Sequence, residues 1–240
     1  MSPDPRRVTG RDVLWVVVAM IAFAILAVVL LTFVYALSVI LGVEWAPNQF
    51  GPSLFAIEAA VIAAAVWLVM VRRRGFAWRD LGWVPVPAPW LALGAVLALA
   101  MLIVLLVLEL LHAQVTGSGR IPTMLDIIPM FPPTIPGLLA AVALGAVAVP
   151  VAEEFLFRGV VYRWMRGRWG VAGGTVVTSL VFALLHPPGW VETPQIFLIG
   201  LLLAWLYERS GSLWPSMVLH GVNNAAGIVV IYAVLWSGTT

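Results

Sequence analysis

Long apolar runs dominate this sequence, and the first of them covers residues 13 to about 41. A helix needs about 20 apolar residues to cross the hydrocarbon core of a bilayer, so this run is long enough to span a membrane with some tilt. A secretion signal has an apolar core of only about 7 to 15 residues, so the run is interpreted as an uncleaved first span. Hydrophobic residues make up 62% of the chain and charged residues 10%, unlike a soluble globular protein. The sequence therefore predicts an all-α, polytopic membrane helix bundle.

Seven spans are predicted, and the arginines give them an orientation. The fifth and sixth spans are short, and a re-entrant hairpin there would change the count. All 13 basic residues are arginine; eleven of them lie in the tail and loops on one side, and only Arg120 lies in the loops on the other side. Because short cytoplasmic loops are rich in arginine and lysine, the amino terminus is expected in the cytoplasm. The predicted spans cover roughly residues 13–41, 53–71, 90–112, 136–162, 171–186, 192–207 and 214–236.

The chain is expected to form a single transmembrane domain over residues 1–240. Residues 1–135, with the first three spans and an external loop, are interpreted as a scaffold, and residues 136–236 as catalytic helices. The sequence contains no cysteine, which excludes disulfides, thiolate catalysis and cysteine-based metal sites. The arginines lie mostly in short loops rather than in a polyanion-binding patch, so no nucleic-acid partner is expected.

The fourth predicted span carries three charged residues, Glu153, Glu154 and Arg158. A charge at the centre of a span costs roughly 2.5 to 3.5 kcal/mol, so these residues require an explanation. Glu154 and Arg158 have i, i+4 spacing with the acid first, the better orientation for an ion pair, and are expected to neutralise each other. Glu153 is rotated from Glu154 by about 100° on a helix and remains free for chemistry. The alternative is a structural charge cluster near the cytoplasmic interface.

Two further pairs of residues have the same helical spacing. Phe182 and His186 end the fifth predicted span, and His220 and Asn224 lie inside the seventh. Taken alone, His186 is typical of an interfacial residue, and a buried His and Asn pair is typical of helix association. With a rise of about 1.5 Å per residue, however, these residues are predicted to meet Glu153 near the middle of the membrane.

This combination of side chains suits the hydrolysis of an amide. Glu153 is predicted to take a proton from a water molecule while His186 holds and polarises the same water. The ring of His220 and the amide of Asn224 are predicted to donate to the oxyanion that develops on a peptide carbonyl.

The ordered set Glu153-Glu154-x-x-x-Arg158, Phe182-x-x-x-His186 and His220-x-x-x-Asn224 resembles the CAAX protease and bacteriocin-processing family of intramembrane endopeptidases, which includes the Ras-converting enzyme. The resemblance covers about residues 137–230 and departs from none of the three motifs. It implies that Glu153 and His186 activate water, that His220 and Asn224 form the oxyanion hole, and that Glu154, Arg158 and Phe182 support them.

The same resemblance leaves the cofactor open. No cofactor is expected, because a metal-free mechanism gives Asn224 a role, but the family has also been described as metal-dependent. Zinc takes three protein ligands plus water, which Glu153, His186 and His220 would supply. The expected partners are the lipid bilayer and a membrane protein or lipidated peptide as substrate. The expected location is a prokaryotic cell membrane.

Two other classes of function stay open at this stage. One is an inactive relative that acts as a membrane binding or immunity protein. The other is a transporter or proton relay, which the absence of an evident inverted repeat counts against. Glu58, an acid inside the second span, is a functional candidate by default, although snorkelling or helix pairing explains it equally well. Glu109 and His112 are interpreted as interfacial, and Asn223 is expected to face away from Asn224.

Overall fold

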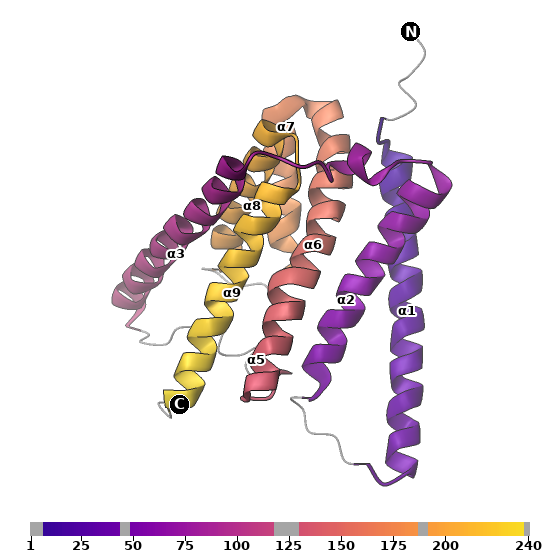
Figure 1. Cartoon of the computed structure of the whole chain (residues 1–240), viewed down its shortest axis with the longest axis vertical. Helices are drawn as coiled ribbons and strands as arrows, with labels where there is room; N and C mark the ends of the chain where they lie inside the picture. Colours follow the sequence, from indigo (N-terminus) through magenta and orange to yellow (C-terminus); the bar gives the residue numbers. More distant parts are fainter. Residues whose placement is uncertain (1–6, 44–48, 118–129, 187–191, 238–240) are drawn as a thin grey trace.

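The computed structural model describes residues 7–43, 49–117, 130–186 and 192–237, and within these ranges it is helical and contains no strand (Figure 1). The first part comprises α1 (Gly10–Ile40), α2 (Phe50–Val66) with its π-helical continuation η2 (Trp67–Arg73), the 3-10 turn η3 (Trp78–Leu81) and α3 (Ala88–Thr116). The second part comprises α5 (Ile135–Ala141), the π-helical η5 (Val142–Ala148), α6 (Val149–Glu154), the π-helical η6 (Phe155–Tyr162), α7 (Arg163–Leu184), α8 (Glu192–Ser210) and α9 (Trp214–Ser237).

The predicted fold class is confirmed, whereas the count of seven spans is not. Five helical stretches in the described ranges are long and apolar enough to cross a membrane: Gly10–Ile40, Phe50–Arg73, Ala88–Val115, Ile135–Leu184 and Trp214–Ser237. The predicted sixth span corresponds to α8, whose apolar run covers only residues 196–206 between polar ends. The predicted fourth and fifth spans fall within one continuous helical stretch. The protein is thus an integral membrane helix bundle.

That continuous stretch doubles back at Gly170, which has a φ of 71° and a ψ of −175°. A positive φ of this kind favours glycine because a β-carbon would crowd the backbone. A β-carbon placed on Gly174 would lie only 2.9 Å from the Cα of Arg166, so the chain returns closely past itself. The later part of α7 therefore runs back along η6, which brings His186 towards the interior of the bundle.

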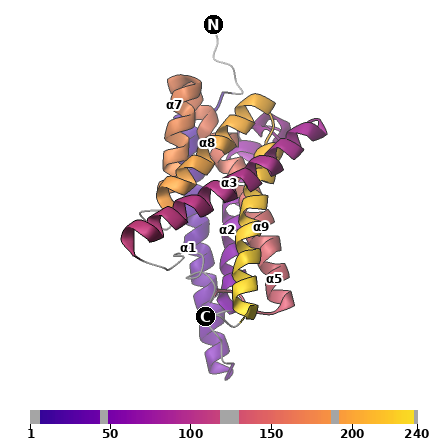
Figure 2. The same cartoon turned by 90° about the vertical axis from the view of Figure 1, so that its left-hand side faces the viewer.

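The stretch from α5 to η6 lies between α2 and α9 (Figure 1), and α3 crosses α9 obliquely (Figure 2). Glycines allow these helices to approach closely. A β-carbon on Gly221 of α9 would lie 2.6 Å from the carbonyl oxygen of Ala146, and one on Gly200 of α8 would lie 2.9 Å from the β-carbon of Ser179. Because lipid is as apolar as leucine, such close packing of small residues drives helix association in membranes.

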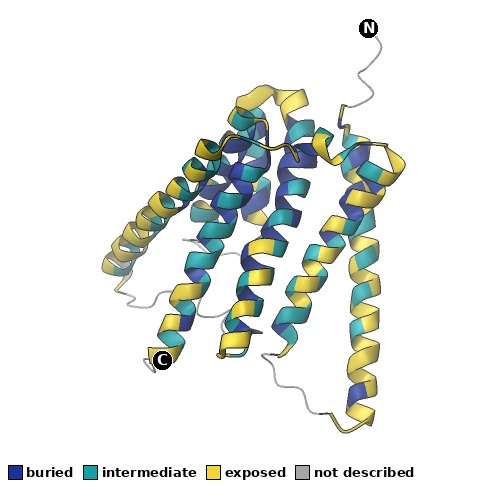
Figure 3. Cartoon of the chain, in the orientation of Figure 1, coloured by how far each residue is buried: buried dark blue, intermediate teal, exposed yellow. Residues whose placement is uncertain are grey.

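Apolar side chains cover the outside of the helices, and several charged side chains are buried between them. The outer faces of α1 and α3 expose large apolar side chains such as Phe33 and Ile103, and the buried residues gather where η6, α7, α8 and α9 meet (Figure 3). Glu154 and Arg158 are fully buried there. In water this arrangement would be unfavourable, but a bilayer solvates the apolar surface and forces the charges inward.

The start of α1 and the end of α9 lie at opposite ends of the bundle (Figure 1), so the predicted orientation in the membrane can be tested. The chain has no natural cysteine, so single cysteines can be introduced by Arg79→Cys in η3 and Ser237→Cys at the end of α9. If the amino terminus is cytoplasmic, a membrane-impermeant maleimide should label Ser237→Cys in intact cells and Arg79→Cys only after permeabilisation. Labelling of both variants from the same side would contradict the predicted topology.

Candidate active site

The candidate site is built on a buried ion pair at the junction of α6 and η6. Nη1 of Arg158 lies 2.8 Å from Oε1 of Glu154, and both side chains are completely buried. This is the pair that the i, i+4 spacing predicts, formed across the start of a π-helical turn. Short π-helical stretches within helices often occur at functional sites.

Two neighbouring helices hold the guanidinium of Arg158. Nη2 donates to the backbone carbonyl of Gly200 in α8 at 3.3 Å. From α7, the ring of Phe182 lies 4.9 Å from the central guanidinium carbon, within the range of a cation–π contact. The carboxylate, carbonyl and ring together surround the arginine in a place where water is not available to solvate it.

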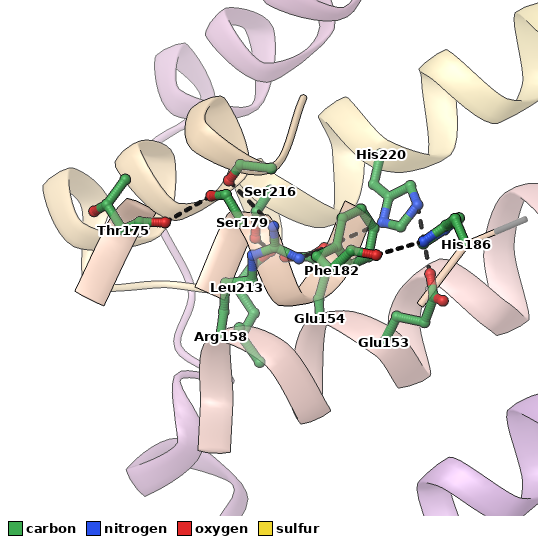
Figure 4. A network of polar contacts seen from close by, with 11 residues as sticks. Glu153, Glu154, Arg158, Thr175, Ser179, Phe182, His186, Leu213, Ser216 and His220 are labelled. Atoms are coloured by element: carbon green, nitrogen blue, oxygen red, sulfur yellow. Dashed lines mark hydrogen bonds and ion pairs between the residues drawn. The ribbon is translucent and has the colours of Figure 1, made fainter. Parts of the chain in front are cut away.

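His220 in α9 connects the two glutamates. Its Nδ1 lies 3.1 Å from Oε1 of Glu154, and its Nε2 lies 3.6 Å from Oε2 of Glu153 (Figure 4). The sequence predicted His220 as an oxyanion donor alongside Asn224, and did not indicate this bridging position. Helix α9 therefore meets the end of α6 through a histidine that both carboxylates approach.

The hydrogen-bond partners define the protonation of the His220 ring. Glu154 forms an ion pair with Arg158, and a carboxylate oxygen can only accept hydrogen bonds. Nδ1 of His220 must therefore carry a hydrogen and donate it to Glu154, which leaves Nε2 facing Glu153.

Phe182 lies at the centre of the cluster and is 1% exposed. Its ring centroid lies 4.5 Å from that of His186 and 5.7 Å from that of His220, the latter edge to face. Figure 4 shows Phe182 with Glu153, Glu154, Arg158 and both histidines around it. The phenylalanine of the second motif thus sets the positions of two histidines and an arginine that come from three helices.

His186 lies directly after α7 and is held by its own helix. Its Nδ1 lies 2.7 Å from the backbone carbonyl of Phe182. Since a carbonyl only accepts, Nδ1 carries the hydrogen, and Nε2 of the neutral ring is an acceptor. This tautomer suits a ring that accepts a hydrogen bond from water.

Asn224 is placed differently from the other predicted site residues. Its side-chain amide donates to the backbone carbonyl of Gly145 in η5 at 3.0 Å, and no contact of Asn224 with Glu153 or His186 is seen within the described ranges. The neighbouring Asn223 is more buried, at 6% exposed, and its amide oxygen has no hydrogen-bond partner in the described part of the chain. The structure therefore brings together Glu153, Glu154, Arg158, Phe182, His186 and His220, with Asn224 one helical turn away.

The sequence also offers Glu153, His186 and His220 as ligands in the zinc-dependent alternative. Among the described residues, no three His, Asp or Glu side chains are grouped so that they could hold a metal ion. Nδ1 of each histidine is engaged, with Glu154 and with the carbonyl of Phe182, and contacts of this kind also orient histidines that bind a metal through Nε2. The side chain of Glu109, the other acid noted in the sequence, lies outside the described residues.

Sequence reasoning missed two backbone groups that shape the site, the carbonyls of Gly145 and Gly200. Each belongs to a glycine where a neighbouring helix passes closely, since a β-carbon on Gly145 would lie 3.4 Å from Ile228, and one on Gly200 would meet Ser179. Glycines in apolar spans are the only signal for such contacts, and the sequence does not say which helix approaches them.

The fold and the cluster together define a helical membrane protein with a buried carboxylate and histidine site. Residues 135–226 match the family model of the Rce1-like proteins, described as type II CAAX prenyl endopeptidases. This match contains all three motifs and confirms, for this segment, the resemblance inferred from them.

A second comparison finds a similar protein in Escherichia coli, described as an uncharacterized 24.3 kDa protein. The two are 29% identical over 100 residues, which is 40% of this chain and 46% of the relative. The chain therefore matches about half the length of the curated relative. No solved structure matches this chain.

The buried ion pair makes a prediction about stability. Glu154→Gln or Arg158→Met leaves one charge buried without its partner, which typically costs about 3 to 5 kcal/mol. Both variants should therefore unfold at clearly lower temperature in detergent and give less folded protein. The matched control is Glu208→Gln, which removes the charge from the partly exposed 2.7 Å pair of Arg166 and Glu208 and leaves an oxygen to accept from Tyr162; it should cost about 0 to 1 kcal/mol. Equal melting temperatures for Glu154→Gln and Glu208→Gln would show that the buried pair does not stabilise the bundle.

Proposed function

We propose that this protein is an intramembrane endopeptidase that hydrolyses a peptide bond of a membrane-associated substrate. The observation that carries the proposal is the contact of His220 with both Glu153 and Glu154 inside the membrane bundle. This contact lies within the segment that matches the Rce1-like family model. The CAAX-type activity of that family supports the choice of a peptide amide as the reacting bond. We assign the protein to a prokaryotic cell membrane, in keeping with its relative in Escherichia coli.

Glu153 and His186 activate the attacking water in this mechanism. The carboxylate of Glu153 accepts one hydrogen of the water, and Nε2 of His186 accepts the other, so the oxygen lone pair is free to attack the peptide carbonyl. As the carbon–oxygen bond forms, the proton moves to Glu153, which acts as the general base. Glu153 then returns this proton to the nitrogen of the leaving amine when the peptide bond breaks.

His220 and Asn224 stabilise the oxyanion of the tetrahedral intermediate. Nε2 of His220 donates to this oxyanion when it carries a hydrogen, and the contact of Nδ1 with Glu154 orients the ring. The amide of Asn224 has two N–H groups, of which one is bound to the carbonyl of Gly145. That bond orients the amide, and the second N–H is the donor to the oxyanion.

The remaining members of the cluster position these groups. Glu154 and Arg158 fix His220 and neutralise each other, and Phe182 holds both histidine rings. We infer no resident cofactor, and treat a zinc-dependent version of the same protease, with Glu153, His186 and His220 as ligands, as the alternative to be tested.

The proposed base predicts the outcome of a direct activity test. Wild-type protein, Glu153→Gln and Glu208→Gln are purified in detergent and incubated with a library of membrane-inserted peptides, and the products are identified by mass spectrometry. Loss of a general base typically lowers the rate about 10²- to 10⁴-fold, so Glu153→Gln should be nearly inactive although folded. The Glu208→Gln control should cleave like the wild type.

Two results would contradict this assignment in different ways. Equal cleavage by the wild type and Glu153→Gln would remove Glu153 as the base. A folded wild type that binds peptides without cleaving any of them would favour the inactive membrane binding or immunity protein.

The metal-free mechanism makes a separate prediction about chelation. If Glu153 and His186 activate water directly, cleavage should survive dialysis against a strong chelator, and elemental analysis of the active protein should find no stoichiometric metal. Activity that is lost on chelation and restored by Zn²⁺ would instead support the zinc-dependent alternative.

A further inference from the structure

Glu58 is an intramembrane carboxylate that the proposed mechanism does not use. It lies in α2, within the candidate span Phe50–Arg73, and more than a third of its surface is exposed. No ion pair or hydrogen bond of its side chain is found within the described parts of the chain. An ionisable group inside a span without a partner is expensive and usually has a function.

Contacts of α2 place Glu58 beside the candidate site. One turn before it, the ring of Phe55 approaches Gly145, at 3.4 Å from the position of a β-carbon there. The carbonyl of Gly145 is the group that holds Asn224. Glu58 therefore lies about one helical turn further along α2 than the level at which Asn224, the proposed oxyanion donor, is anchored.

Further along the same face, α2 lies against the helix that carries Glu153. Ala59 and Ala63 line a cleft of about 270 Å³ together with Val151 and Ala152 of α6. Glu58 directly precedes Ala59 in this cleft lining, and Glu153 directly follows Ala152. Glu58 thus adds a second negative charge to the surroundings of the proposed base.

This additional charge has no counter-ion in the cluster. The positive charge of Arg158 is taken up by Glu154 at 2.8 Å, and His220 lies between Glu154 and Glu153. One carboxylate therefore remains in the membrane interior with nothing from the described protein to neutralise it. A cationic group brought by the substrate would complete the balance of charge.

We propose that Glu58 is a specificity-determining residue that binds a lysine or arginine side chain of the peptide substrate. This inference rests on the proposed endopeptidase function. It narrows the substrate class to membrane-associated peptides that carry a basic residue near the bond to be cleaved.

Helix geometry gives the expected separation between the basic residue of the substrate and the bond to be cleaved. Gly145 precedes Glu153 by eight residues and Phe55 precedes Glu58 by three, so Glu58 lies roughly 7 Å from the level of Glu153 along the helix axes. An extended peptide advances about 3.3 Å per residue. The basic residue is therefore expected about two residues from the scissile bond.

The test uses pairs of membrane-inserted peptides that differ at one position, which holds either arginine or its neutral isostere citrulline. The position is moved through the three residues on each side of the cleavage site. For the wild type, kcat/KM should favour arginine about tenfold at one position, through KM, as expected for a charge-assisted hydrogen bond. In Glu58→Gln the ratio of kcat/KM for the arginine peptide to that for the citrulline peptide should fall to about one. Glu58→Asp should keep part of the arginine preference, and the Glu208→Gln control should keep all of it.

Two outcomes would overturn the proposal. One is an unchanged arginine preference in Glu58→Gln. The other is an equal loss of cleavage for both peptides of each pair, which would indicate that Glu58 serves helix packing or snorkelling. Melting temperatures of Glu58→Gln and Glu58→Asp in detergent identify any loss that is due to misfolding.

A binding measurement separates this inference from the proposed function. Fluorescence anisotropy with the same labelled peptides compares Glu153→Gln with the double variant Glu153→Gln, Glu58→Gln. Tighter binding of the arginine peptide only when Glu58 is present would support the cation site even if the wild type cleaves nothing. Equal affinities for the arginine and citrulline peptides would refute it whether or not the wild type is a protease.

Discussion

The bundle depends on a single ion pair, that of Arg158 with Glu154. A bilayer cannot hydrate a buried guanidinium or carboxylate, so each is tolerable only when protein groups replace the water. Here the replacement comes from several helices at once, since α6 and η6 supply the pair, α8 supplies the carbonyl of Gly200, and α7 supplies the ring of Phe182. The solvation of one arginine thereby fixes the positions of these helices relative to one another.

The same contacts prepare the groups that the proposed chemistry uses. Oε1 of Glu154 accepts from both Arg158 and His220, so the structural carboxylate also determines which nitrogen of His220 carries its hydrogen. Phe182 packs against Arg158 with its ring and binds His186 through its carbonyl. Stability and reactivity are therefore linked, because the groups that satisfy the buried charges also orient the histidines.

Two polar residues beside this cluster, Asn224 and Glu58, have different proposed roles. Asn224 is anchored to η5 through Gly145, and Glu58 lies on the neighbouring α2 without a counter-ion among the described residues. A site with paired charges at its centre and an unpaired carboxylate nearby is suited to select a cationic substrate.

The sequence by itself determined the membrane class, the pairing of Glu154 with Arg158 and the three motifs, because hydropathy and i, i+4 spacing are local properties of a helix. Only the tertiary structure placed His220 between two carboxylates, engaged Nδ1 of His186 and directed Asn224 towards Gly145. These contacts depend on how the helices cross and on the π-helical turns, neither of which the hydropathy pattern indicates. The predicted seven spans were not confirmed, because residues Ile135–Leu184 form one helical stretch and the apolar run of α8 is short.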